Sequence, residues 1–146
     1  MVSKSGNEFL TNRAWFKDVV GGKEQVLCYT SALECLDLFC GYIREIEIDV
    51  YAKQKGEYEN INYRIVNSFD EIEIVQFDNV LCTSFNQTVN DMLGSLNDID
   101  PQPLLEALNE YYFDHDKNFD GLVIKPENQE RFDSIKDWAI EYHYMG

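Results

Sequence analysis

Hydrophobic residues recur along this chain with two different periods, and the change of period predicts where strands give way to helices. From Arg44 to Ala52 apolar residues occupy every second position, which is typical of a strand with one buried face. The alternation returns over Ile61–Ile65, and a turn at Lys55–Glu57 predicts that the two runs form a hairpin. Glu73–Phe77 is a third strand candidate, followed by a tight turn at Asp78–Asn79.

The stretch Val80–Leu93 joins the two periods, and we expect the fold to be organised around it. Val80–Cys82 is short and apolar, as the end of a buried strand should be. Thr83 or Ser84 can cap a helix, because a side-chain oxygen accepts from the free amides of the first turn. The apolar residues that follow at helical spacing are Val89, Met92, Leu93 and Leu96. The pattern predicts a strand, a sharp turn and a helix that packs back onto the sheet.

The N-terminal part predicts a helix, a strand and a second helix. Asn7–Val20 carries apolar residues at helical spacing, and the two glycines that follow it are expected to end the helix. Val26–Tyr29 reads as a short strand. Thr30 or Ser31 is then expected to cap a helix that Gly41 ends.

The C-terminal third is predicted to be helical. Asp100 followed by Pro101 is a helix start signal, a capping Asp before Pro at the first helical position. Its predicted buried stripe consists of Leu104, Leu105, Leu108, Tyr111 and Tyr112. Pro126 begins a second helix, whose apolar side consists of Phe132, Ile135, Trp138, Ala139 and Tyr142.

Together these elements predict one α+β domain over residues 1–146. The run of strands favours a mixed, mostly antiparallel sheet of about four strands packed with helices, because a parallel sheet would need strict alternation of strand and helix. The length of 146 residues and the 45% of hydrophobic residues suit a single domain with a real core. There is no internal repeat and no linker that marks a second domain.

The cysteines and the termini place the chain in the cytoplasm by expectation. No apolar run approaches the roughly 18 residues of a membrane span, and the N-terminus lacks the apolar core of a signal peptide. The four cysteines form no CxxC pair, and neither histidine is spaced with a cysteine as zinc ligands usually are. We interpret Cys28, Cys35, Cys40 and Cys82 as reduced core thiols.

The net charge of −15 is unevenly distributed. Between Arg64 and Lys117 there is no Lys or Arg, while eleven Asp and Glu fall in that interval. Nucleic-acid binding needs cations that displace condensed counterions, so we expect no nucleic acid to bind. The acids either keep the protein soluble or form a docking surface for a basic protein, and the charge pattern alone leaves both open.

Catalytic motifs are absent from the sequence. It contains no GxxxxGK[ST], GxGxxG, GxSxG or HExxH. Glu45, Glu47 and Asp49 share one face of the predicted strand, as divalent-metal nucleases require. Lys53 would lie about 13 Å from Asp49 along that strand, too far to share such a site. Amphipathic patterning of a strand explains these acids, and we predict no catalytic, cofactor-binding or metal-binding residues and no enzyme activity.

The segment Asp116–Glu127 fits the calcium-loop pattern D-x-N-x-D-G-x-x-x-x-x-E. Asp116, Asn118 and Asp120 would supply oxygens, Gly121 the sharp turn and Glu127 a bidentate carboxylate. The alternative is a connection between two helices that uses Asn, Asp and Gly for its turns. Pro126 precedes the last ligand, and no second loop of this kind occurs in the chain. A calcium-binding or other regulatory module built on this loop is therefore one of two functional classes open to the chain.

Three segments share their order and spacing with a known family: residues 29–33 with Gly41, the strand at residues 46–52, and residues 83–93. Together they resemble the C-terminal domain of AbiEi-type antitoxins from bacterial type IV toxin–antitoxin systems. Tyr29–Leu33 with Gly41 is similar to that family's SAL…G helix, and the strand IEIDVYA follows it. Thr83–Leu93 is similar to the family's TSxxRTxxDxL helix, with Leu105–Leu108 after it. The order and spacing match over roughly residues 25–115. Gln87 stands where the family usually has a charged residue.

The resemblance implies a non-enzymatic protein that binds and neutralises a nucleotidyltransferase-type toxin or a related partner. The family also carries an N-terminal winged helix that binds operator DNA, for which the 25 or so residues before the match are too few. We therefore expect a protein partner carrying positive charge and no DNA-binding arm. Each matched residue also has a structural role open to it: Ser31, Thr83 and Ser84 as helix caps, Thr88 and Asp91 as ties to a neighbouring turn.

Overall fold

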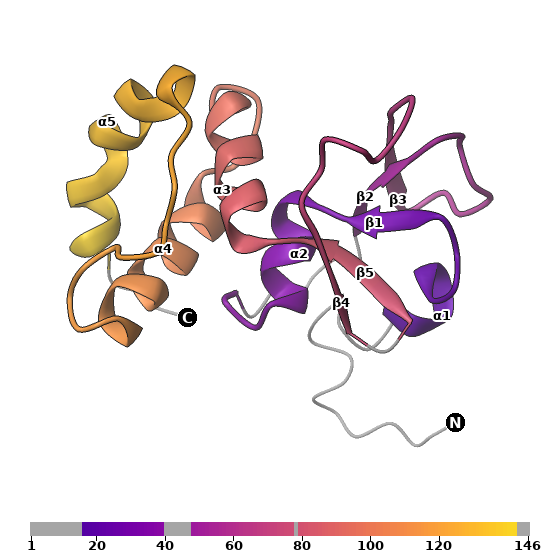
Figure 1. Ribbon diagram of the computed structural model, residues 1–146, viewed down its shortest axis with the longest axis horizontal. Coiled ribbons are helices and arrows are strands. Elements are labelled where there is room, and N and C mark those ends of the chain that lie inside the picture. Colours follow the sequence, from indigo (N-terminus) through magenta and orange to yellow (C-terminus); the bar gives the residue numbers. More distant parts are fainter. Residues whose placement is uncertain (1–15, 40–47, 78, 143–146) are drawn as a thin grey trace.

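A computed structural model describes residues 16–39, 48–77 and 79–142, which form a five-stranded sheet with helices packed beside it (Figure 1). The strands are β1 (Gln25–Leu27), β2 (Ile48–Ala52), β3 (Ile61–Ile65), β4 (Ile74–Phe77) and β5 (Val80–Thr83). The helices are α1 (Phe16–Val20), α2 (Tyr29–Cys35), α3 (Phe85–Gly94), α4 (Gln102–Asp114) and α5 (Gln129–Ile140), with a 3₁₀ turn, η3 (Pro126–Asn128), before α5. The α+β class and the helical C-terminal third are confirmed.

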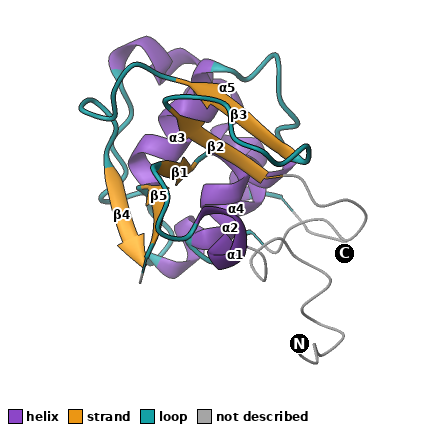
Figure 2. Ribbon diagram, turned by 90° about the vertical axis from the view of Figure 1, so that its right-hand side faces the viewer, coloured by secondary structure: helices purple, strands orange, loops and turns teal. Residues whose placement is uncertain are grey.

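The sheet differs from the prediction in strand number and in direction. Its order is β3-β2-β1-β5-β4, and Figure 2 shows β3 and β4 at opposite edges. The β1–β2 and β4–β5 pairs are antiparallel, whereas β1–β5 and β2–β3 are parallel. The sheet is therefore mixed, with five strands instead of about four, and it is not mostly antiparallel.

The predicted hairpin between β2 and β3 is wrong, because residues 53–60 carry the chain back so that β3 runs parallel to β2. This crossover lies against Tyr63: the Tyr58 amide donates to the Tyr63 hydroxyl at 3.3 Å. Gly56 is so close to the Tyr63 hydroxyl that a Cβ would clash. Eight residues are long enough to span a five-residue strand. Alternation of apolar residues specified the buried face of β2 correctly and that of β3 only in part, since Ile65 is exposed, and it carries no information on strand direction.

The N-terminal elements agree with the prediction only in part. α1 ends before Gly22, whose φ of +74° suits the expected glycine stop, and predicted helical residues 7–15 lie outside the described part. Tyr29 opens α2 instead of ending the strand, and neither Thr30 nor Ser31 caps it, since the N-cap is Cys28. Residues 40–47, with Gly41 and Glu45, lie outside the described residues.

α2 ends earlier than the sequence predicts, because Asp37 takes the role assigned to Gly41. Asp37 adopts a left-handed conformation, with φ +65°. Its amide donates to the carbonyl of Glu34, and the amide of Leu38 donates to the carbonyl of Leu33. This pair of bonds is a Schellman motif, which satisfies the free carbonyls at the end of the helix.

The strand–turn–helix at Val80–Leu93 is confirmed. Val80–Thr83 is β5, and the Ser84 hydroxyl caps α3 by accepting from the Gln87 amide at 3.1 Å. The predicted core residues Val89, Met92 and Leu93 are fully buried, and Leu96 packs against the same cluster.

The two C-terminal helices are confirmed with small shifts. α4 begins one residue later than expected, since its N-cap is Pro101, and the Asp100 carboxylate accepts from the Gln102 amide at 3.0 Å. Of the predicted stripe, Leu104, Leu105 and Leu108 are buried, whereas Tyr111 and Tyr112 are half-buried. Pro126 opens η3, which leads into α5. Trp138 is wrongly predicted as buried: 55% of its surface is exposed, since it lies about a quarter-turn from the stripe of Phe132, Ile135 and Ala139.

Two apolar clusters hold the described part of the chain together. One face of the sheet, including Leu27, Val50 and Cys82, packs against α1 and Ala32 of α2. The second cluster lies among helices α2, α3, α4 and α5, and its buried members include Leu33, Met92 and Leu108. Cys28 and Cys82 are buried and Cys35 is half-buried, and none of these three forms a disulfide, while Cys40 lies outside the described residues. No described helix has the length and apolar character to cross a membrane.

We predict that Met92→Ala lowers the free energy of unfolding by about 2–5 kcal/mol, because it leaves a cavity in the helical cluster. Urea denaturation measures this loss. Asn97→Ala, at an exposed position just past α3, is the control and should change the free energy little. Equal stabilities of the Met92→Ala variant and the unmodified chain would contradict the placement of α3.

Candidate functional site

The parallel pairing of β1 with β5 brings two strand–helix junctions side by side. β1 leads directly into α2 and β5 into α3, so both helices start at the same end of the sheet. In open sheets this carboxyl end of adjacent parallel strands is a common place for functional residues. Five polar or aromatic residues gather here, and we call them the junction cluster: Tyr29, Asp49, Tyr51, Arg64 and Asp91.

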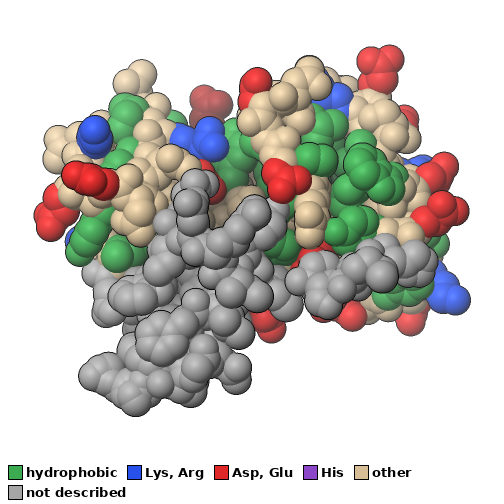
Figure 3. All heavy atoms as spheres, turned by 180° about the vertical axis from the view of Figure 1, so that it is seen from behind, with side chains coloured by type: hydrophobic (Ala, Val, Ile, Leu, Met, Phe, Trp, Pro, Cys, Tyr) green, Lys and Arg blue, Asp and Glu red, His purple; other side chains and the backbone are tan. Residues whose placement is uncertain are grey.

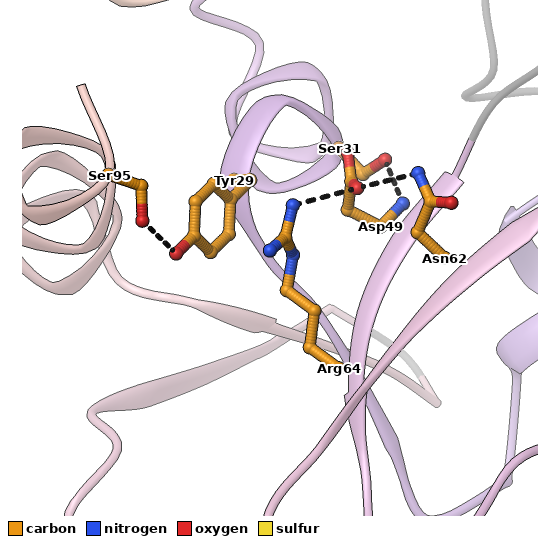
Figure 4. Close-up of polar contacts among 6 residues, drawn as sticks. All are labelled: Tyr29, Ser31, Asp49, Asn62, Arg64 and Ser95. Atoms are coloured by element: carbon orange, nitrogen blue, oxygen red, sulfur yellow. Dashed lines mark hydrogen bonds and ion pairs between the residues drawn. The ribbon is translucent and has the colours of Figure 1, made fainter. Parts of the chain in front are cut away.

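Arg64 of β3 occupies the centre of the junction cluster. Its guanidinium carbon lies 3.8 Å from the centroid of the Tyr29 ring, a cation–π contact. Its Nη2 lies 3.5 Å from Asp49 Oδ1, which also accepts from the Asn62 amide nitrogen at 3.1 Å (Figure 4). The Arg64 side chain is 38% exposed and that of Asp49 is 13% exposed, so water reaches the arginine much more than the carboxylate.

Tyr29 has an unusual backbone conformation. It is the first residue of α2 and has φ +52°, which is rare for a bulky residue and costs conformational energy. The Tyr29 hydroxyl hydrogen-bonds with Ser95 Oγ at 2.9 Å, and its ring meets the Tyr51 ring edge-on at 6.3 Å. Contacts from α3 and two strands therefore hold this backbone in place.

Asp91 of α3 is a largely buried carboxyl whose pKa is raised. Burial raises its pKa, while hydrogen bonds from Tyr51 and Gln87 act in the opposite direction. Gln87 Nε2 donates to Asp91 Oδ1 at 2.9 Å, but Oδ2 is buried and has no hydrogen-bond partner in the part described here. A buried oxygen without a partner loses its hydration without compensation, which favours the protonated carboxyl.

The nearby thiol and phenol are held in their protonated forms. Burial raises the pKa of Cys28, and the charge of Asp49 adds to the effect. Burial also raises the pKa of Tyr51, with Asp91 as the second cause. A thiolate or phenolate is the nucleophilic form of these groups, so the cluster suppresses nucleophilic chemistry at these two side chains.

The hydroxyl residues singled out in the sequence lie near this site and have structural contacts. Ser31 Oγ accepts from the Asp49 amide at 2.9 Å, which ties α2 to β2 (Figure 4). Thr83 Oγ1 and Thr88 Oγ1 are 2.6 Å apart and buried, and Thr88 also bonds to the Ser84 carbonyl. Ser31 and Thr83 are therefore not the helix caps that the structural alternative predicted, whereas Thr88 does tie α3 to the turn before it.

The strand acids do not form a described metal site. Asp49 is engaged by Arg64 and Asn62, and Glu45 and Glu47 lie outside the described residues. Lys53 pairs with Glu24 at 3.3 Å. Within residues 16–39, 48–77 and 79–142, no three His, Cys, Asp or Glu side chains come together as metal ligands would.

The Asp116–Glu127 loop is docked onto α3 by two asparagines. Asn86 Oδ1 accepts from the Val123 amide at 3.0 Å, and Asn90 bonds to both Val123 and Lys125 at 2.8 Å. Within the loop, Asn118 Oδ1 accepts from the Asp120 amide at 2.8 Å, which closes an Asx turn. Calcium binding would need the carboxylates of Asp116, Asp120 and Glu127 to move together.

Sequence reasoning missed Arg64, Tyr51 and Tyr29 as members of one site. Arg64 and Tyr51 occupy the polar face of alternating strands, a face that the pattern assigns to water. The one available signal was that Arg64 is the last cation before the long cation-free interval. Asp91 was noted only as part of the resemblance.

No protein-family model matches this chain, and no curated protein is significantly similar to it in sequence.

We predict that Asp91→Asn stabilises the protein increasingly as the pH rises from about 4, the ordinary pKa of an aspartate. A carboxyl whose pKa is raised by folding makes stability fall between its unfolded and folded pKa values, and Asn cannot ionise. The measurement is urea denaturation of both proteins across the acid-to-neutral range. Asp98→Asn removes one exposed charge and serves as the control. A difference between the Asp91→Asn variant and the unmodified chain that stays constant with pH would contradict the assignment.

We also predict that calcium leaves the melting temperature unchanged, because Asn118 Oδ1 is engaged in an Asx turn and no three carboxylates of the described residues come together as metal ligands would. Differential scanning calorimetry with and without calcium measures this. A rise in melting temperature that Asp116→Ala abolishes would instead establish a calcium site.

Proposed function

We propose that this chain is a non-enzymatic, antitoxin-like protein that binds and neutralises a nucleotidyltransferase-type toxin or a related basic partner. The observation that carries the proposal is that all three segments of the antitoxin resemblance contribute to the junction cluster. Tyr29 comes from the first segment, Asp49 and Tyr51 from the second, and Asp91 from the third. Because these segments are far apart in the sequence, their convergence supports a resemblance that covers one folded unit.

The junction cluster holds helices and strands of the domain together. Its side chains are too buried to form the main contact surface for a partner. Tyr29 is 8% exposed, and Asp91 Oδ2 is buried. A partner needs accessible side chains, and large exposed aromatic residues are the usual anchors of interfaces. Phe113, at the end of α4, and Trp138, on α5, are both about half exposed.

Exposed acidic residues lie on the same helices as these anchors: Asp114 follows Phe113 directly, and Asp137 precedes Trp138. Figure 3 shows hydrophobic side chains gathered on the helical half of the rear face, with Asp and Glu side chains around them. Of the acids proposed from the sequence, Asp98 and Glu110 are exposed and Glu106 is half-buried, so the first two are the better contacts. Further exposed acids on these helices and the loops that join them are Asp100, Asp114, Asp116, Asp120, Glu127, Glu130, Asp133, Asp137 and Glu141.

The charge of this surface fits the proposed partner class. A nucleotidyltransferase binds anionic phosphates, so its cleft is expected to be basic. An acidic surface with aromatic anchors would dock there, and opposite charges would accelerate association and make it sensitive to salt.

The test is co-expression with the product of the neighbouring gene, followed by pull-down at low and at high salt. We expect a complex that weakens as salt rises, and Asp98→Lys with Glu110→Lys should weaken it further at low salt. Trp138→Ala should lower affinity at both salt concentrations, because it removes an apolar anchor.

The matched control is Glu57→Lys with Glu59→Lys, which makes the same change of charge at two exposed positions on the β2–β3 crossover. This variant should bind nearly as well as the unmodified chain. Equal weakening by both charge reversals would reject the acidic helical surface as the contact, and the absence of any complex would reject the proposed function.

A further inference from the structure

The outer edge of β3 is a strand edge with no neighbour in the part of the chain that the structure describes. β3 is the first strand in the sheet order, and its inner edge pairs with β2 along all five residues, from Ile48 opposite Ile61 to Ala52 opposite Ile65. The register is unbroken, so no bulge twists the edge away. Natural proteins usually protect such an edge with Pro, a bulge or an outward charge, because it can pair with another chain.

The hydrogen bonds to β2 show which backbone groups of β3 point outward. The Ile48 amide donates to the Asn60 carbonyl at 3.2 Å, and the Val66 amide donates to the Ala52 carbonyl at 2.9 Å. In a parallel ladder, alternate residues direct both backbone groups to the same neighbour. The even-numbered residues 60–66 therefore face β2. The residues whose N–H and C=O groups point outward are Ile61, Tyr63 and Ile65.

An open groove of about 610 Å³ follows this edge. It is lined by all five residues of β3 and by Lys55 of the crossover. Successive side chains of a strand point to opposite faces, so a groove that touches five in a row must run along the backbone. The inner edge is occupied by β2, which leaves the outer one.

The side chains along the groove do not block a neighbouring strand. The Arg64 guanidinium is directed over the sheet to Tyr29 and Asp49 (Figure 4). Ile65 is 56% exposed, an apolar side chain left in water at the end of the strand. Lys55 belongs to the crossover and is exposed, so its flexible side chain can leave the groove.

We propose that β3 pairs antiparallel with β3 of a second copy of this chain, about a two-fold axis at Tyr63. Tyr63 then faces Tyr63 of the second copy, and Ile61 and Ile65 of each copy face each other. In an antiparallel ladder, residues two apart form successive hydrogen-bonded pairs. The three outward-facing residues of each copy are therefore all used. The interface is isologous, as in most two-fold dimers.

Three features favour a second copy over an unrelated peptide. The outward-facing residues Ile61, Tyr63 and Ile65 are symmetric about Tyr63, so each of their N–H and C=O groups finds a partner in an identical strand. On one face, exposed Ile65 meets Ile61 of the other copy, an apolar cross-strand pair. On the other face, Arg64 lies opposite Asn62, so no like charges face each other.

The net charge of the chain determines how this dimer responds to salt. Two copies, each carrying −15, repel each other, and salt screens that repulsion. Dimerisation should therefore strengthen as salt rises, whereas the complex with a basic partner should weaken. The dimer is independent of the proposed function, and the two can fail separately.

The test is sedimentation equilibrium of the full chain from micromolar to submillimolar concentrations, with amide hydrogen exchange followed by NMR. We expect a reversible monomer–dimer equilibrium that strengthens with salt. The amides of Ile61, Tyr63 and Ile65 should gain protection as concentration rises. Those of Asn62, Arg64 and Val66, which face β2, should be protected at all concentrations.

Ile65→Pro removes an outward N–H that the ladder with β2 does not use, and it should weaken dimerisation by about tenfold or more. Ile65→Lys keeps the N–H but places a charge on the edge, and it should also weaken the dimer. The matched control is Ile74→Pro in β4. Ser84 donates to the Glu73 carbonyl, so Glu73 faces β5 and the Ile74 amide points away from the sheet.

Ile74→Pro should leave dimerisation unchanged. The proposal is overturned if the chain remains monomeric at all concentrations, or if it dimerises without protection at the three odd-numbered amides. It is also overturned if Ile65→Pro, with its β2-facing amides still protected, dimerises as well as the unmodified chain. Protection of the three amides only on addition of another protein would assign the edge to that partner instead.

Discussion

Val26 and Leu27 of β1 pair in parallel with Leu81 and Cys82 of β5, and this short contact joins two segments more than 50 residues apart. Both residues of β1 are fully buried at the centre of the sheet. Parallel neighbours end at the same edge, so α2 and α3 start side by side and pack against each other and α4. The helical cluster and the junction cluster both depend on this pairing, because α2 and α3, which it brings side by side, contribute residues to both.

The junction cluster shows how burial and charge offset each other at that edge. Arg64 is held between the Tyr29 ring and the Asp49 carboxylate, while Asp91 keeps one buried oxygen without a partner. The positive φ of Tyr29 and the raised pKa of Asp91 both carry an energetic cost. The surrounding helices supply the contacts that offset it. These contacts join α2, α3, β2 and β3, so the junction cluster fixes the positions of these elements relative to one another.

Hydrogen bonds from asparagine side chains join the elements of the C-terminal region. Asn90 and Asn128 are almost fully buried, and Asn128 Nδ2 donates to both the carbonyl and the side-chain oxygen of Asn90. With Asn86, they join α3, the Asp116–Glu127 loop and η3. A buried amide needs such partners, and here the backbone of an irregular loop provides them. The docking therefore uses the backbone of the loop at Gly121, Val123 and Lys125, and not the side chains of the calcium pattern.

Local chemistry in the sequence determined the class of the fold, most helix and strand positions and the main core residues. Ser84 as a cap, Asp100 before Pro101 and the stripe with Val89 and Met92 follow from interactions within one or two turns. Only the tertiary structure decided the direction of β3 and its parallel pairing with β2. The early end of α2 at Asp37 and the exposure of Trp138 have local causes that the sequence pattern did not single out. The tertiary structure also brought Tyr29, Asp49, Arg64 and Asp91 together. Periodicity tells which side of an element is buried, but contacts between distant segments determine which elements meet and in which direction.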